Sequence, residues 1–480
     1  MSVETQTLQQ GLKAIRAALD DKGWVDDPKA LEPWLVDSRG LYHGKALGMA
    51  KPKSVGEVSA VMAAAYAAGI PVVPQGGNTG RVAGATPDGS GKMLLINLSR
   101  MNQIRDLDAA NDTMTVEAGC ILKSLQEKAD AADRLFPLSL GAEGTCQIGG
   151  NLASNAGGIN VVRYGNTRDL VLGLEAVLPD GRIWNGMTGL RKNNTGYDLK
   201  HLFMGSEGTL GIITGAVLKL FPKPKVRATA LVALSELDAA LDLLAEAKSA
   251  SAGTLSSFEL MPGFALDWAE RLVEGARRPF DETYDWTVLL EFAGGQGVDD
   301  ALQGLLERAF EAGQVVDAVI AQSEDQRGQL WFLREAIVDA QNREGVQIKH
   351  DISVPVSAVP TFIRQAAKAV EATQPGTRPY PFGHVGDGNI HYNLSQPTDM
   401  DGEAFTKRAP DLHKAVHDVV DGLHGSISAE HGIGRSKRDE LARYKDPIEM
   451  DIMRQVKRAL DPKGLMNPGA LLPDAVVPDS

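Results

Sequence analysis

The sequence predicts an α+β protein with two main domains, and three observations support this prediction. The chain has 480 residues, which corresponds to about three ordinary domains or two large ones. Residues 141–216 hold 16 of the 51 glycines, so loops are concentrated in the first half. After residue 222 the expected elements follow the order βαββαβ, which is typical of a ferredoxin-like sheet with helices on one face.

Each element of the first half is bounded by a recognisable signal. Ser54 and Glu57 have the spacing of a capping box and start an alanine-rich helix that ends at Gly69. Pro179-Asp180-Gly181 lies between two apolar runs and predicts a β-hairpin. Residues 221–225, Phe-Pro-Lys-Pro-Lys, have the composition of a linker. The other expected elements are a helix near 121–132 and strands at 70–74, 93–98, 113–117, 172–178, 182–184 and 211–220.

The second half begins with the βαββαβ unit. Its expected elements are, in order, 228–234, 235–248, 254–260, 286–292, 298–312 and 315–321. Further helices are expected near 323–341, 358–372, 409–424 and 438–460. We therefore expect domains at 1–222 and 223–425, followed by a C-terminal segment, 426–480, that packs back on the first domain.

Composition excludes several classes of protein. The net charge of −13 argues against a nucleic-acid-binding or lipid-binding surface over a whole domain. Cys120 and Cys146 are the only cysteines, too few for a disulfide framework or a four-cysteine metal site. No run approaches the ~18 apolar residues of a membrane helix, and the N-terminus does not resemble a secretory signal. We therefore expect a cytoplasmic protein.

Three glycine clusters in the first half predict a bound dinucleotide. They occupy residues 75–80, 141–158 and 205–211, and each lies beside an expected strand. Consecutive backbone N–H groups in such loops form anion nests that suit a pyrophosphate. The G-x-G-x-x-G and G-x-x-x-x-G-K-[ST] motifs are both absent from the sequence, so Rossmann and Walker loops do not explain the glycines. A turn-rich β domain would explain one cluster, whereas three together favour a dinucleotide.

The same clusters resemble a known superfamily. The loop PQGGNTG, the stretch PLSLGAEGTCQIGGNLASNAGGINVVRYG and the segment GSEGTLGIIT resemble the FAD-binding half of the vanillyl-alcohol oxidase/p-cresol methylhydroxylase superfamily. The resemblance reaches the closing LMNPGALL and so covers nearly the whole chain. It implies a two-part FAD-binding domain of the p-cresol methylhydroxylase type at 1–222, a ferredoxin-like substrate or cap domain, and a C-terminal helical segment that returns to the flavin.

By this resemblance, the first loop holds the FAD pyrophosphate and the other two clusters hold the rest of the cofactor. Ile213 would face the adenine, and Asn467 would return to the flavin. The loop 74–86 contains neither histidine nor cysteine, and Cys146 is interpreted as a packing residue, so we expect non-covalent FAD. The expected cofactor contacts are Pro74, Gln75, Gly76, Gly77, Asn78, Thr79, Gly80, Gly141, Ala142, Thr145, Gly149, Gly150, Asn151, Ser154, Gly157, Gly158, Gly208, Ile213 and Asn467.

Two motifs of the second half predict a metal site. GHVGDGNIH contains His384 and His391, and AEHGIG contains Glu430 and His431. Two imidazoles and one carboxylate make a three-ligand divalent site with open positions, as a catalytic metal needs. Polar residues satisfied within loops are the alternative, but two such clusters hemmed by glycine favour the metal.

These motifs resemble those of the D-2-hydroxyacid dehydrogenase branch of the superfamily, closest to the D-2-hydroxyglutarate dehydrogenases. There the metal ligands correspond to His384, His391 and Glu430, and the position of His431 faces the substrate, where we expect it to be the catalytic base. Zinc is the expected metal, with manganese and iron(II) as alternatives. By contrast, three histidines on an expected helix are interpreted as surface or packing residues: His413, His417 and His424.

Arg334 and Lys349 suggest a substrate with two carboxylates. Each alone would be an ordinary solvated charge, but the D-2-hydroxyglutarate dehydrogenases carry an arginine and a lysine in matching contexts, where they bind substrate carboxylate. Asn393 would support the 1-carboxylate. Val338 stands where those enzymes have a threonine, which leaves D-malate as an alternative to D-2-hydroxyglutarate.

The resemblance thus implies oxidation of a D-2-hydroxy acid to the 2-oxo acid by hydride transfer to flavin N5, assisted by a divalent metal. The alternatives are a D-lactate dehydrogenase, a non-redox relative such as the alkyl-dihydroxyacetone-phosphate synthases, and a subunit of a glycolate oxidase. A soluble electron-transfer flavoprotein or a quinone is the expected electron acceptor. A homodimer is expected from base rates alone.

Overall fold

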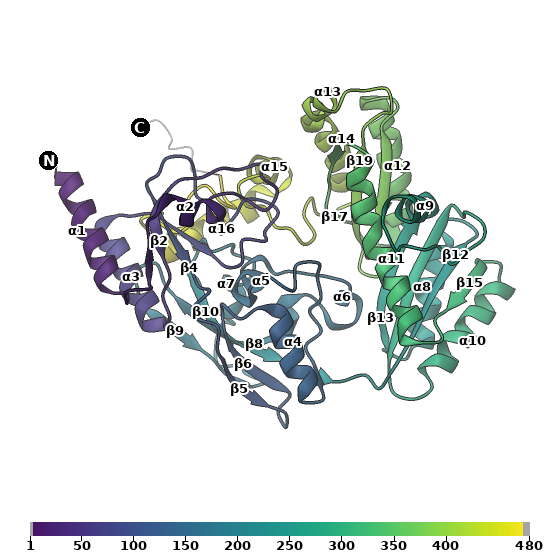
Figure 1. Cartoon of the computed structure of the whole chain (residues 1–480), viewed down its shortest axis with the longest axis horizontal. Helices are drawn as coiled ribbons and strands as arrows, with labels where there is room; N and C mark the ends of the chain where they lie inside the picture. The colour runs from purple at the N-terminus through teal and green to yellow at the C-terminus, as the bar shows by residue number, and fades with distance from the viewer. Residues whose placement is uncertain (1–2, 474–480) are drawn as a thin grey trace. The chain divides into compact units, whose positions relative to one another are not determined.

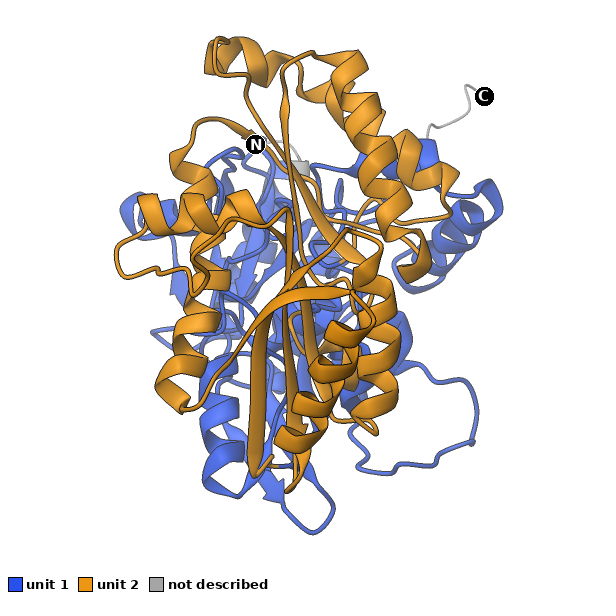
Figure 2. Ribbon diagram, turned by 90° about the vertical axis from the view of Figure 1, so that its right-hand side faces the viewer, with its two compact units in different colours: residues 1–157, 166–222, 430–480 blue, residues 158–165, 223–429 orange. Residues whose placement is uncertain are grey.

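The computed structural model describes residues 3–473, which form two compact units (Figure 1, Figure 2). Unit 1 comprises residues 1–157, 166–222 and 430–480, and unit 2 comprises residues 158–165 and 223–429. The short segment 158–165, which the expected first domain included, belongs to unit 2. Both units combine sheets with helices, so the α+β class is confirmed.

The first sheet of unit 1 carries the first glycine loop at the end of one strand. Its order is β1-β2-β4-β3, in which β2, β4 and β3 are parallel. The strands are β1 (Trp24–Val25), β2 (Ala46–Ala50), β3 (Val72–Gln75) and β4 (Met93–Asn97). Helices α1 (Val3–Ala17) and α3 (Val55–Ala68) pack side by side, and their apolar residues share one buried core with Val72, Leu94 and Ile96 (Figure 1). Two short helical segments, α2 (Pro28–Leu31) and Glu32–Trp34, precede β2.

Local signals predict the ends of α3 correctly. The side chain of Ser54 accepts the N–H of Glu57 at 3.2 Å, and Gly69 closes the helix in a left-handed conformation with φ of 67°. A residue without a Cβ adopts this conformation at the least cost, so the helix stops there.

The second sheet of unit 1 is antiparallel, with the order β5-β6-β10-β8-β9. Its strands are β5 (Ile104–Asp108), β6 (Thr113–Glu117), β8 (Val171–Val177), β9 (Ile183–Gly186) and β10 (Ile212–Lys219). The hairpin predicted at Pro179-Asp180-Gly181 joins β8 to β9. The linker expected at residues 221–225 begins at residue 223 in the structure, because Phe221–Pro222 forms β11 and pairs with β7 (Arg134–Leu135). Helices α4 (Leu122–Ala131) and α7 (Lys200–Phe203) complete this part of the unit.

The second glycine cluster is partly helical, although the sequence suggested a continuous loop. Residues Ile148–Ser154 form α5 despite two glycines, whose helix propensity is low. Packing explains the glycine at position 149, because a Cβ there would lie 2.7 Å from the Cβ of Ala118. The glycine therefore lets α5 approach the backbone around Ala118 closely.

Unit 2 contains the predicted ferredoxin-like sheet. The strands follow the order β13-β14-β12-β15, and all neighbours are antiparallel. They are β12 (Val226–Leu234), β13 (Leu255–Pro262), β14 (Trp286–Gly294) and β15 (Val315–Ile320), with the crossover helices α8 (Ala239–Ala250) and α10 (Val298–Glu311). An additional helix that the sequence did not predict, α9 (Gly263–Leu272), lies in the chain between β13 and β14.

A smaller sheet in the same unit carries the histidine motif. Strand β19 (Asn389–Ser395) pairs with β16 (Gln347–Ile348), β17 (Ile352–Ser353) and β18 (Arg378–Phe382). Helix α11 (Glu324–Arg343) packs against α9, and α12 (Val359–Thr373) packs against α14 (Ala409–Gly422) (Figure 1). The short elements α6 (Val161–Tyr164) and α13 (Gly402–Lys407) also belong to unit 2.

The C-terminal segment of unit 1 contains two helices where the sequence suggested one. Helix α15 (Arg438–Tyr444) ends before Pro447, and α16 (Pro447–Leu460) begins with that proline. A proline disfavours the α conformation in the residue before it, which explains the break. After α16 the chain returns to β3, where the N–H of Asn467 donates to the carbonyl of Val72 at 2.8 Å. Within residues 3–473, no helix is both long and apolar enough to cross a membrane.

We expect Asp446→Ala to lower the free energy of unfolding by about 1 kcal/mol, the usual cost of losing an N-cap. The Asp446 carboxylate accepts the N–H groups of Ile448 at 2.8 Å and Glu449 at 3.1 Å. Urea denaturation monitored by circular dichroism measures the change. Asp446→Asn is the matched control, because asparagine also caps. An equal loss in both variants would show that the charge matters rather than the cap.

Candidate functional site

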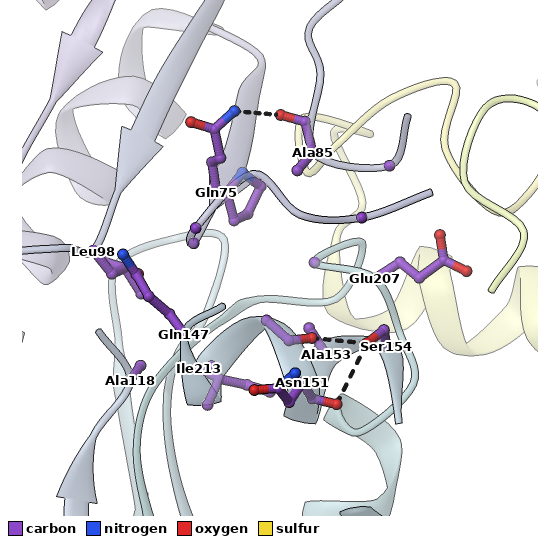
Figure 3. Close-up of a pocket in the computed structure, with 18 of the residues that line it drawn as sticks. Gln75, Ala85, Leu98, Ala118, Gln147, Asn151, Ala153, Ser154, Glu207 and Ile213 are labelled. Carbon is purple, nitrogen blue, oxygen red and sulfur yellow. Dashed lines mark hydrogen bonds between the residues drawn. The ribbon is translucent and has the colours of Figure 1, made fainter. Parts of the chain in front are cut away.

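A large cavity in unit 1 is lined by all three glycine clusters (Figure 3). It encloses about 1010 Å³, part of which is open to solvent. The predicted cofactor residues that line it are Pro74, Gln75, Gly76, Gly77, Asn78, Thr79, Gly80, Gly149, Gly150, Asn151, Ser154, Gly208 and Ile213.

The first loop is held in place by side-chain hydrogen bonds to neighbouring backbone. Gln75 donates from Nε2 to the carbonyls of Trp34 at 2.9 Å and Ala85 at 3.0 Å (Figure 3). Asn78 has a φ of 56°, and its amide donates to the carbonyl of Val36 at 2.8 Å. A Cβ at Gly77 would lie 2.2 Å from the carbonyl oxygen of Thr145, so this position requires glycine. Contacts within the protein therefore hold the loop in this conformation.

The second cluster contributes α5 and the residue before it. Gln147 is buried, and its Oε1 accepts no hydrogen bond from the residues that the structure describes. A buried acceptor without a partner is costly, so a ligand with a donor group suits this position. Ser154 donates back to the carbonyl of Gly150 at 2.9 Å (Figure 3). Cys146 also lines the cavity, and burial raises the pKa of its thiol, which keeps it protonated.

Glu207 ties the third cluster to the loop that carries His431. Its carboxylate accepts the N–H groups of Ile433 at 2.8 Å and Gly434 at 2.7 Å. Burial raises the pKa of Glu207, although these two hydrogen bonds act in the opposite direction. A Cβ at Gly432 would lie 2.8 Å from Oε1 of Glu207, which explains the glycine after His431. As a result, His431 lines the cavity of unit 1.

Asn467 supports the cavity from behind. Its amide donates to the carbonyl of Gly84 at 2.7 Å and to that of Glu207 at 2.9 Å. Both of these residues line the cavity, whereas Asn467 itself does not. Asn467 therefore positions two residues of the lining, and its expected contact with the flavin stays a prediction.

Five predicted cofactor residues lie elsewhere. Gly141, Ala142 and Thr145 are outside the lining, and Gly158 belongs to unit 2. Gly157 is also outside, and a Cβ there would lie 2.7 Å from Oε1 of Glu430. This glycine thus makes room for the carboxylate that the sequence predicts to be a metal ligand.

In unit 2, one buried carboxylate joins the predicted metal-binding and substrate-binding side chains. Glu259 of β13 accepts Nδ1–H of His384 at 2.6 Å, and it pairs with the guanidinium of Arg334 at 2.8 Å. All three side chains are buried. Burial alone would raise the pKa of Glu259, but the charges of His384 and Arg334 outweigh it and lower this pKa to about 2. The carboxylate is therefore ionised and fixes both neighbours.

His391 and Asn393 lie on β19 with the alternation expected of a strand. The rings of His391 and His384 meet edge to face, with centroids 5.5 Å apart. Nδ1 of His391 lies 3.7 Å from Oδ1 of the buried Asp351. The amide of Asn393 donates to Oε1 of Gln341 at 2.9 Å, which fixes its orientation.

Lys349 lies near the far end of the helix that carries Arg334. Its Nζ donates to Oδ1 of Asn342 at 2.6 Å. Arg334, Val338 and Asn342 are spaced by four residues on α11, so they follow one face of that helix. Eight residues of helix span about 12 Å, so Arg334 and Asn342, which accepts the hydrogen bond of Lys349, lie about two turns apart on this face. Val338 lies between them and packs on the core of the unit.

Sequence reasoning missed Gln147, Glu207, Glu259 and Asp351. Glu207 stands in a recognised glycine cluster, so its motif was visible but its role was not. Glu259 lies in an ordinary strand, and its partners are 75 and 125 residues away in the chain. No local signal could identify such a residue.

Comparisons with known proteins identify the family of the chain. Residues 223–471 match the family described as FAD linked oxidases, C-terminal domain, and residues 46–186 match the FAD binding domain family. The D-2-hydroxyglutarate dehydrogenase of Xanthomonas citri pv. viticola is 37% identical over 466 residues, which cover 97% of this chain and 96% of that protein. The mitochondrial D-2-hydroxyglutarate dehydrogenase of Arabidopsis thaliana is 36% identical, over 95% of this chain and 80% of that protein. Among solved structures, p-cresol methylhydroxylase with bound substrate superposes with a TM-score of 0.72 at 16% identity, over 97% of this chain and 96% of that chain.

Proposed function

The chain belongs to the family of FAD-linked oxidases that includes the D-2-hydroxyglutarate dehydrogenases, and from this premise we propose that it oxidises a D-2-hydroxy acid with two carboxylates. The chain is accordingly an FAD-dependent oxidoreductase. One observation carries the proposal: Glu259 holds a guanidinium and an imidazole side by side in unit 2. A guanidinium suits a carboxylate, and an imidazole suits a metal that binds a 2-hydroxy acid.

The cavity of unit 1 would hold FAD. The backbone of the first loop is fixed and open on the cavity side, which suits a pyrophosphate, and Oε1 of Gln147 suits a donor group of the cofactor. When bound, the flavin supplies the hydride acceptor. We propose that FAD binds non-covalently, because the pKa of the Cys146 thiol is raised and this thiol is therefore a poor nucleophile.

His384, His391 and Glu430 would hold a divalent metal, with zinc as our first choice. Glu259 fixes Nδ1 of His384, which leaves Nε2 as its ligand atom, and a carboxylate behind a histidine is the usual support of a metal ligand. A neutral histidine pair with a carboxylate suits zinc, manganese or iron(II). When bound, the metal acts as a Lewis acid on the substrate hydroxyl.

The remaining residues would bind the substrate and move its proton. Arg334 and Lys349 would hold the distal carboxylate, and Asn393 would support the 1-carboxylate. His431 would take the hydroxyl proton as general base, since a neutral imidazole is available near pH 7. D-2-hydroxyglutarate is the preferred candidate and D-malate the second, because Val338 supplies no hydroxyl between the two cations. A soluble electron-transfer flavoprotein or a quinone would reoxidise the flavin.

Anaerobic bleaching of the flavin tests this proposal. D-2-hydroxyglutarate, D-malate and D-lactate are added separately to the FAD-loaded protein, before and after chelation. We expect rapid bleaching by a dicarboxylate and its loss on chelation. Bleaching by D-lactate alone would support oxidation of a D-2-hydroxy acid but would overturn the proposed site for a second carboxylate. If none of the three bleaches bound FAD, a non-redox relative or a glycolate oxidase subunit would replace the dehydrogenase as the proposed function.

We expect Lys349→Met to lower kcat/KM for the dicarboxylate by about 10- to 100-fold, since a hydrogen bond to a charged group contributes about 1.5–3 kcal/mol. The value for D-lactate, which has no distal carboxylate, should change by less than about twofold. Stopped-flow flavin reduction with each substrate measures both. Lys368→Met, an exposed lysine on α12, is the matched control. Equal losses for both substrates would contradict a role at the distal carboxylate.

A further inference from the structure

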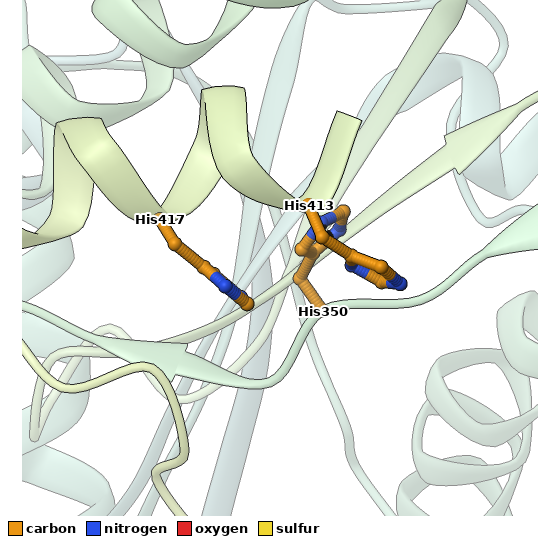
Figure 4. Close-up of side chains that lie close together, drawn as sticks. All are labelled: His350, His413 and His417. Carbon is orange, nitrogen blue, oxygen red and sulfur yellow. Dashed lines mark hydrogen bonds between the residues drawn. The ribbon is translucent and has the colours of Figure 1, made fainter. Parts of the chain in front are cut away.

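Unit 2 contains a second cluster of histidines, apart from the residues assigned above. His413 and His417 project from one side of α14 toward the segment between β16 and β17, which carries His350 (Figure 4). One ring nitrogen of each residue lies within 4.8 Å of those of the other two. His350 and His417 are buried, and His413 is partly exposed. From the sequence, the two helical histidines are expected to be surface or packing residues, but the structure brings them together with a third imidazole.

The hydrogen bonds of His350 define which of its nitrogens can bind a cation. Its Nδ1 lies 2.8 Å from the carbonyl oxygen of Tyr392. A carbonyl only accepts, so Nδ1 carries the proton and Nε2 presents its lone pair. That Nε2 faces Nδ1 of His413 at 2.9 Å. The carbonyl of Tyr392 thus orients the His350 ring, as the hydrogen-bond partner of a metal-bound histidine usually does.

The spacing of the three rings suits a metal ion with tetrahedral coordination. Two nitrogens bound to one zinc at about 2.0 Å lie about 3.3 Å apart, so the pair at 2.9 Å needs to separate by only a few tenths of an ångström. His413 and His417 are one helical turn apart, which is the spacing of histidine ligands on a zinc-binding helix. The ring centroids of His350 and His417 are 5.4 Å apart and their planes nearly perpendicular, so the two rings converge from different directions.

We propose that His350, His413 and His417 form a second divalent metal site, which takes zinc or a similar transition ion through three imidazoles. A solvent molecule would complete the coordination, because His413 is partly exposed. The ion would clamp α14 to the segment that carries Lys349, and the N–H of His350 already donates to Oδ1 of Asn393 at 3.2 Å. Occupancy would therefore stabilise the segment that carries Lys349 and its contact with Asn393 of β19.

Zinc content of the full-length, FAD-loaded protein tests this site. The wild-type protein and three variants, His413→Asn, His417→Asn and His424→Asn, are stripped with chelator, reloaded with zinc and desalted, and metal per chain is measured by mass spectrometry. We expect the first two variants to hold one zinc fewer per chain than wild type. His424 is exposed and has a φ of 57°, a conformation that asparagine tolerates, so its variant should match wild type.

Equal zinc in wild type and in both cluster variants would overturn the proposal, because the three rings would then be a hydrogen-bonded packing cluster only. If a variant fails to retain FAD, anomalous scattering at the zinc edge decides the question in zinc-soaked crystals of the wild-type protein. A peak between the three rings supports the site, and its absence overturns it. The comparison does not depend on the site at His384 and His391, which is unchanged in every variant.

Discussion

Replacing His384 with asparagine is expected to lower turnover of a D-2-hydroxy acid by about 10³-fold, because a Lewis-acid metal contributes several kcal/mol to such a step. The amide of asparagine can occupy the place of Nδ1 and still donate to Glu259, which His384 contacts at 2.6 Å. The Nε2 ligand atom is lost. The substitution therefore separates metal binding from the support of the buried carboxylate. Anaerobic flavin reduction at saturating substrate measures the rate.

Bound FAD should stay at the wild-type level in this variant. Every residue that lines the cavity belongs to unit 1, whereas His384 belongs to unit 2. The metal content should fall by one equivalent per chain, and chelation of the wild-type protein should reproduce the loss of rate. His424→Asn is the control, since that histidine is exposed. Near-native turnover without added metal would contradict the proposed role of His384.

The parts of the fold that sequence reasoning predicted are those with local causes. Ser54 and Gly69 begin and end α3 through contacts within a few residues, and both were visible in the sequence. The hairpin at residues 178–182 depends on one turn signal in the same way. Helix α5 was missed because its two glycines lower the local helix propensity, and the contact that requires Gly149 is with Ala118, 31 positions earlier.

In the candidate site, too, the residues in local motifs could be predicted, whereas residues that are distant in sequence could not. The glycine loops and the histidine motifs are contiguous, so their pattern was visible, and most of the first-loop residues line the cavity. The residues that orient them are distant in sequence. Glu207 reaches the N–H groups of Ile433 and Gly434 across more than 220 positions. His350 meets His413 across 63 positions, and no motif links them.

This division has a physical basis. A side chain that touches a ligand often stands in a glycine-rich segment, since close backbone approach is needed there, and this leaves a trace in composition. A side chain that supports another needs only burial and a donor or acceptor at the right place. Glu259 fulfils that requirement from an otherwise ordinary strand. Supporting residues therefore have to be found in the structure.

Replacing His431 with asparagine is expected to lower the rate of flavin reduction by about 10²- to 10⁴-fold, the usual contribution of a general base. His431 lines the cavity of unit 1, and its loop is fixed by Glu207 through two backbone N–H groups. Asparagine can keep a hydrogen bond but cannot accept a proton near neutral pH. FAD and metal content should therefore remain at the wild-type level while the rate falls.

The pH profile distinguishes a base from a residue that only positions the substrate. The wild-type rate should fall at low pH as the base becomes protonated, and the His431→Asn rate should lose this acid limb. Added imidazole should restore part of the activity of His431→Ala, because the smaller side chain leaves room for it. A His431→Asn rate within tenfold of wild type, with an unchanged acid limb, would mean that another group takes the hydroxyl proton. The two glycines of the loop would keep their structural explanation in that case, because a Cβ at Gly432 would lie 2.8 Å from Oε1 of Glu207 and one at Gly434 would lie 2.1 Å from the carbonyl oxygen of Val82.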